Sequence, residues 1–82
     1  MKEEVIKLIG NELESINVFI DDVYLEKEGN QNYLRVVIDA NDVIDIDRVV
    51  QATKIIDPAI EKADLVKDEY ILDVYAKSKG DD

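Results

Sequence analysis

The chain has 82 residues, of which 46% are hydrophobic, and its 20 acidic and 10 basic side chains give a net charge of −10. This length supports one small domain with a modest core and excludes two independent cores. The absence of cysteine and histidine excludes disulfide scaffolds, zinc, iron–sulfur and haem sites, and Ser-His or Cys-His catalysis. The negative charge repels phosphate backbones and favours cationic partners. No run approaches the roughly 20 apolar residues of a membrane helix, and no basic, apolar secretory signal opens the chain, so we expect a cytoplasmic protein.

The first predicted element is an amphipathic helix over residues 2–15. Acidic Glu3 and Glu4 stand in its first turn, where the helix dipole favours them. Apolar residues recur at the helical spacings of three and four, namely Val5, Ile6, Ile9, Leu13 and Ile16.

A β-hairpin follows, because two runs of alternating apolar and polar residues, 18–27 and 33–39, flank a Glu-Gly-Asn-Gln turn at 28–31. Ile20 stands out of phase with Val23 and Leu25. Either Ile20 lies off the apolar face of the strand, or a bulge at Asp21-Asp22 separates it from the later residues.

A second amphipathic helix is predicted to begin at Asp45, whose side chain can cap the first amides. Its apolar face is expected to hold Ile46, Val49, Val50, Thr53 and Ile56. Pro58 predicts a break at Asp57, followed by a short helical turn over residues 58–62. Residues 70–76 alternate as a third strand, and residues 77–82 are expected to form a charged, disordered tail.

The predicted order, α-β-β-α-β, favours an α+β two-layer sandwich in which two helices pack on one face of a three-stranded sheet. The strand order stays open, because the crossover can place the third strand beside either hairpin strand. The side chains expected to face the helices are Val23, Leu25, Leu34, Val36, Ile38, Leu72 and Val74. The opposite face, called here the open sheet face, should carry Tyr24, Tyr33, Arg35, Val37, Ile71 and Tyr75.

The densest acidic run, residues 39–47, does not fit a calcium-binding loop. The position that needs Gly holds Ile44, and the position that needs Glu holds Val50. A solvated loop ending in a helix cap is the simpler interpretation. The neighbouring acids Asp21 and Asp22 point to opposite faces of a strand, so they form no catalytic pair. We therefore predict no enzymatic activity, cofactor or metal, and no sequence-specific RNA or DNA reading, since the chain has no Gly-x-x-Gly loop.

Two surfaces are left as candidates for partner binding. The open sheet face is unusually apolar, which suits either contact with another surface or ordinary cross-strand pairing. The aspartates around the start of the second helix, Asp39, Asp42, Asp45 and Asp47, are called here the acidic edge. They either bind a basic partner or only keep the domain soluble. The candidate partner-binding residues are Asp39, Asp42, Asp45, Asp47, Tyr33, Arg35, Val37, Ile71 and Tyr75.

Four segments carry a resemblance to a known family. Residues 23–29 and 33–39 of the hairpin, with 44–47 and 70–74, resemble the N-terminal domain of the bacterial ribosome maturation factor RimP family. The resemblance covers about residues 1–76, which we expect to form a single, monomeric domain, and it implies a cytoplasmic, non-enzymatic factor. Such a factor would mature the small (30S) ribosomal subunit by contact with a basic ribosomal protein.

The family normally continues into a small β-barrel through a Ser-Pro-Gly-type linker. Here residues 75–80 replace that linker, so the chain is either an excised domain or a short relative. An acidic adaptor or nucleic-acid mimic that occupies a basic cleft of an unrelated protein is the alternative function.

Overall fold

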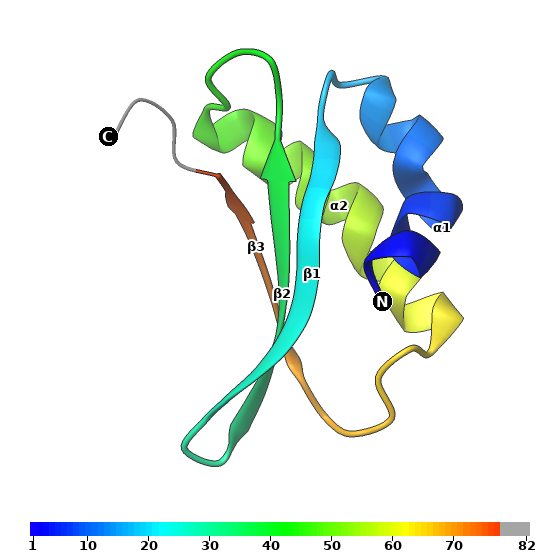
Figure 1. Ribbon diagram of the computed structural model, residues 1–82, viewed down its shortest axis with the longest axis vertical. Helices are drawn as coiled ribbons and strands as arrows, with labels where there is room; N and C mark the ends of the chain where they lie inside the picture. The colour runs from blue at the N-terminus through cyan, green and yellow to red at the C-terminus, as the bar shows by residue number, and fades with distance from the viewer. Residues whose placement is uncertain (78–82) are drawn as a thin grey trace.

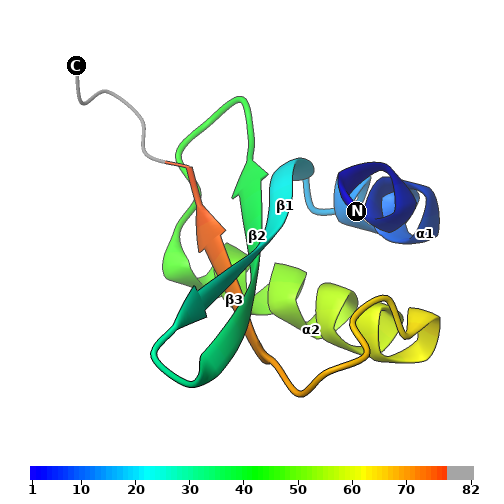
Figure 2. The ribbon, with the colours of Figure 1, turned by 60° about the horizontal axis from the view of Figure 1, so that its bottom comes forward.

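The order of helices and strands is the one predicted. The computed structural model describes residues 1–77 and places two helices on one face of a three-stranded sheet, an α+β two-layer sandwich (Figures 1 and 2). The elements are α1 (Lys2–Glu14), β1 (Phe19–Glu28), β2 (Gln31–Asp39), α2 (Ile46–Ala63) and β3 (Ile71–Ala76).

The strand order, which the sequence left open, is β1-β2-β3 with β2 in the centre. β1 and β2 are antiparallel, whereas β3 runs parallel to β2 with Leu34 opposite Leu72. A parallel pair needs a long crossover, and α2 supplies it on the covered face of the sheet.

Of the two alternatives for Ile20, the structure shows the bulge. The register shifts between Ile20, which pairs with Ile38, and Asp22, which pairs with Val37, so Asp21 is the extra residue. The bulge brings Ile20 onto the core face, where it is 6% exposed. At the hairpin tip, Gly29 has a φ of 61°, a left-handed value that costs a residue without a Cβ little.

The core lies between the sheet and both helices. Its fully buried side chains include Leu13 of α1, Leu34 and Ile38 of β2, and Ile56 and Ile60 of α2. Of the α1 residues predicted to be apolar-facing, Val5, Ile9 and Leu13 are buried, Ile16 is half-buried and Ile6 is 39% exposed.

Three strand residues predicted for the core are less buried than expected. Leu25 is 49% exposed, because the end of the hairpin projects beyond the helix layer (Figure 1). Leu72 and Val74 are half-buried, since β3 is an edge strand and neighbours cover it on one side only.

The predicted break at Pro58 is wrong, because α2 continues through this residue to Ala63. Ile56 and Ile60, on either side of Pro58, are at most 1% exposed, and their burial holds the helix together despite the missing N–H. Pro58 itself is exposed.

The predicted apolar face of α2 needs one further correction. Ile46 and Val50 are 78% and 47% exposed, so they lie outside the core. The buried side of the helix instead follows Ala52, Ile56 and Ile60, with Val49 and Thr53 half-buried beside it.

At the C-terminal end, the Lys77 amide donates a hydrogen bond of 2.8 Å to the Ile38 carbonyl, so this residue continues the sheet pairing. The remainder of the predicted tail, residues 78–82, lies outside the described residues.

Candidate functional site

Arg35 organises the open sheet face. Its guanidinium donates to Glu26 at 2.9 Å and Glu28 at 2.8 Å on β1, and to Asp73 on β3. The ring of Tyr33 lies 4.4 Å from the guanidinium carbon, within cation–π range. These carboxylates, with the hydrogen bonds to Glu26 and Asp73 foremost, raise the pKa of Arg35. The Arg35 guanidinium is therefore bound by carboxylates of its own sheet.

A pair of tyrosines spans the central strand of this face. The hydroxyls of Tyr24 on β1 and Tyr75 on β3 meet at 2.9 Å across β2. That hydrogen bond, with burial adding to its effect, raises the pKa of Tyr75 to about 12. Val37, which lies on β2 beside Tyr75, is only 6% exposed. The prediction that Val37 offers an accessible contact is wrong, because neighbouring side chains on the same face cover it.

What is left exposed on the open sheet face is a smaller area than the sequence suggested. Ile71 is 44% and Tyr75 38% exposed, while Tyr33 is half-buried. Tyr33 and Ile71 are direct neighbours across β2 and β3. The face thus combines cross-strand pairing, which stabilises the sheet, with a narrow apolar margin along β3.

The acidic edge is built around the start of α2. Asp45 is the N-cap, and its Oδ1 accepts from the Arg48 amide at 2.9 Å, which confirms the predicted cap. Asp42 accepts two hydrogen bonds from the Arg48 guanidinium, at 2.9 and 2.6 Å. These bonds raise the pKa of Arg48. Asp47 is exposed in the first turn, where the helix dipole favours its charge.

Asp39 belongs to the end of β2 rather than to the helix. Its Oδ1 accepts from the Ala40 amide at 2.8 Å, and the side chain is half-buried. The connection from Asp39 to Asp45 carries the chain from the sheet layer to the helix layer. The acidic edge therefore covers one end of the sandwich.

The structure brings only part of the predicted site together. Tyr75 lies opposite Val37, close to the acidic edge, but Tyr33 and Ile71 pair near the start of β2. Asp39 lies six positions after Tyr33 along the strand, which corresponds to about 20 Å. A partner that touches both groups must extend along the sheet.

Sequence reasoning missed two exposed apolar side chains within the acidic edge. Val43 is 76% and Ile46 is 78% exposed, on either side of the Asp45 cap. For Ile46 the available signal was its place directly after the Asp45 cap, at the end of the helix, whereas Val43 lies in the connection before the cap. Protein-contact surfaces combine an exposed apolar patch with a polar rim, and these two side chains with the nearby aspartates supply both kinds of residue.

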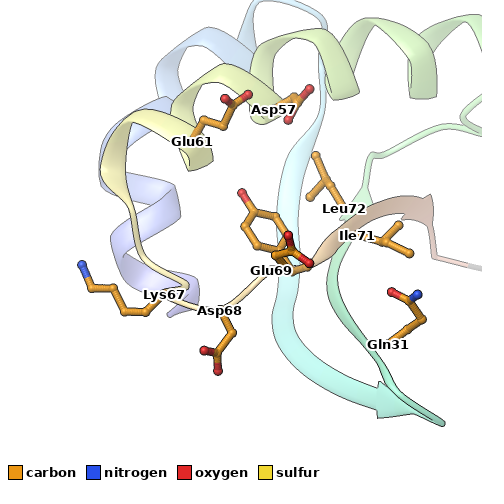
Figure 3. A pocket seen from close by; sticks show the side chains of 9 residues that line it. Gln31, Asp57, Glu61, Lys67, Asp68, Glu69, Ile71 and Leu72 are labelled. Atoms are coloured by element: carbon orange, nitrogen blue, oxygen red, sulfur yellow. The ribbon is translucent and has the colours of Figure 1, made fainter.

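A second acidic region lies at the start of β3. The groove there is lined by Asp57 and Glu61 of α2, by Asp68 and Glu69 before β3, and by Leu72 (Figure 3). Lys67, also on its margin, is already paired with Asp64 at 2.8 Å. Tyr70 lines the groove as well, and burial, with the nearby carboxylates of Asp57 and Glu61, raises the pKa of its hydroxyl.

Residues 1–77 contain no group of three or more carboxylates arranged to hold a metal ion. Within the same residues, no helix has the length and apolar character needed to cross a membrane.

Comparison with models of protein families identifies the family of this chain. Residues 8–77 match the family model of the RimP N-terminal domain, and this range contains both candidate surfaces. The chain belongs to the RimP N-terminal domain family. The resemblance inferred from the hairpin, the helix start and the last strand is confirmed. The RimP family is one of ribosome maturation factors and is not a known enzyme family.

Proposed function

We propose that this RimP N-terminal domain acts in the cytoplasm in maturation of the small (30S) ribosomal subunit, by binding a basic ribosomal protein through its acidic edge. The observation that carries the proposal is the composition of that edge. Asp45 and Asp47 flank exposed Ile46, and exposed Val43 lies two residues before Asp45, in a chain whose net charge is −10. Carboxylates attract a basic partner over distance, and the apolar pair supplies contact area once it docks.

The charge of the whole domain supports a protein partner over direct RNA binding. A phosphate backbone would be repelled by a surface of this sign, whereas Lys- and Arg-rich protein would be attracted. Arg35 and Arg48, the cations of the two candidate surfaces, are both bound to carboxylates.

Co-sedimentation with small-subunit precursors tests the proposal. The parent domain should migrate with precursor particles isolated from cells that lack the protein, and Val43→Ser/Ile46→Ser should reduce the bound fraction. Because both side chains are exposed, these changes should leave the thermal midpoint unchanged. Leu8→Ser, at a 48% exposed residue of α1, is the matched control and should bind as the parent does.

Absence of the parent from the precursor fractions would contradict the proposal. Stable capture of an unrelated basic protein instead would favour the adaptor or nucleic-acid mimic.

A further inference from the structure

The outer edge of β3 has unpaired backbone groups. β3 ends the sheet, and the Lys77 amide points toward β2, where it donates to Ile38. Because successive residues of a strand direct their backbone groups to opposite sides, the N–H and C=O groups of Leu72, Val74 and Ala76 point away from β2. Within residues 1–77 these outward groups have no hydrogen-bond partner.

The opposite edge of the sheet is protected in ways that β3 is not. β1 has a bulge at Asp21, and charged residues occupy its last three positions, 26–28. Bulges and charges of this kind keep an edge strand from pairing with another chain. β3 is regular over six residues, and its one charged side chain, Asp73, is bound to Arg35 on the open sheet face.

The surroundings of β3 are complementary to a basic chain. Asp57 and Glu61 project from α2 beside Leu72, on the flank of the strand, and Asp68 and Glu69 lie at its start (Figure 3). At its other end β3 approaches the acidic edge, because it runs parallel to β2, which ends at Asp39. An added strand would thus have carboxylates along its course.

We propose that the outer edge of β3 binds an extended basic segment of the partner as a fourth strand. Leu72, Val74 and Ala76 would supply the backbone hydrogen bonds, and alternate Lys or Arg side chains of the segment would lie near Asp57 and Glu61. The inference rests on the proposed basic partner and adds how it is held. A second copy of this chain fits poorly, because pairing two β3 edges would bring like carboxylates together.

Amide hydrogen exchange on the parent domain tests this directly. The probe is a short synthetic peptide in which lysine and valine alternate, and its control replaces every lysine by glutamate. At a peptide concentration about ten times Kd, exchange of the Leu72, Val74 and Ala76 amides should slow by roughly tenfold. The glutamate peptide should have no effect.

Proline variants locate the binding edge. Val74→Pro removes an outward N–H without removing a bond to β2, and should weaken binding of the lysine peptide by at least about tenfold, or roughly 1.4 kcal/mol. Ala76→Pro is a second variant at a smaller side chain, in case the first does not fold. Leu25→Pro is the matched control, because counting back from the closing pair Glu28 and Gln31 directs its N–H away from β2 on the β1 edge. It should bind as the parent does.

Three results would overturn the proposal: no protection of the three amides, equal protection by the glutamate peptide, or concentration-dependent self-association that Val74→Pro abolishes. Different results would contradict the proposed function and the proposed β3 binding mode. If Val74→Pro still co-sediments as the parent does, the β3 edge is not the binding mode, but the ribosomal role stands. If the peptide protects β3 and the domain does not co-sediment, the ribosomal role fails and the strand-binding edge stands.

Discussion

The open sheet face and the acidic edge carry similar residue types but use them differently. On the open sheet face, Arg35 binds carboxylates of both neighbouring strands, and the Tyr24 and Tyr75 hydroxyls bind each other. At the acidic edge, Arg48 binds Asp42, while Asp47, Val43 and Ile46 remain exposed. On the open sheet face, most polar side chains bind one another, and these contacts stabilise the sheet. The acidic edge leaves charge and apolar area available to a partner.

The largest expected effect comes from the core beneath the open sheet face. Leu34 is 0% exposed, so Leu34→Ala should cost roughly 2–5 kcal/mol of unfolding free energy. A small domain has about 5 kcal/mol in total, so this variant can be largely unfolded at room temperature. Urea titration followed by circular dichroism measures the loss.

Leu25→Ala is the matched control on the same face of the hairpin. With Leu25 49% exposed, its cost should be about 0.5 kcal/mol. Equal losses for Leu25→Ala and Leu34→Ala would contradict the core described above.

A smaller loss of stability should follow from removing Arg35, the cation of the open sheet face. Arg35→Gln leaves Glu26, Glu28 and Asp73 close together without their shared partner, so the thermal midpoint should fall. Since salt screens repulsion between exposed carboxylates, added sodium chloride should recover part of the loss. Lys27→Gln, an exposed cation of β1 with no ion pair among residues 1–77, is the control and should melt as the parent does. A midpoint for Arg35→Gln that equals the parent's would mean that the Arg35 contacts contribute nothing.

A still smaller effect should appear at alkaline pH. The folded-state pKa of Tyr75, about 12, lies above its ordinary value of 10. The protonated Tyr75 hydroxyl therefore contributes its full stabilisation below pH 10, and this stabilisation is lost as the pH rises toward 12. Tyr75→Phe should start less stable and lose less over that range, as urea titrations at several pH values would show. An unchanged alkaline slope in Tyr75→Phe would contradict the hydroxyl pairing with Tyr24.

Local patterns in the sequence predicted most of the fold, because they depend on neighbours along the chain. The Asp45 cap and the hairpin turn at Gly29 were predictable in this way, and the bulge before Asp22 was one of two alternatives that the pattern left for Ile20. The continuation of α2 through Pro58 was not predictable, since only the burial of neighbouring helix residues against the sheet keeps the helix continuous.

The candidate site was less predictable than the fold. Alternation placed Val37 on the open sheet face correctly, but it could not show that nearby side chains would bury it. Likewise, the outer edge of β3 exists only because β3 pairs beside β2, a strand order that the sequence did not determine.

Binding kinetics with small-subunit particles at two salt concentrations test the central claim, that the acidic edge is the surface that recruits the partner. Asp45→Asn/Asp47→Asn removes two charges and keeps a good N-cap, whereas Glu3→Gln/Glu12→Gln removes two exposed charges from α1. The first pair should slow association and flatten its salt dependence more than the second pair. Tyr33→Ala, on the open sheet face, should leave the association rate and its salt dependence as in the parent. Equal association rates and salt dependence for the parent and Asp45→Asn/Asp47→Asn would contradict the claim and leave the acidic edge as a solvated surface.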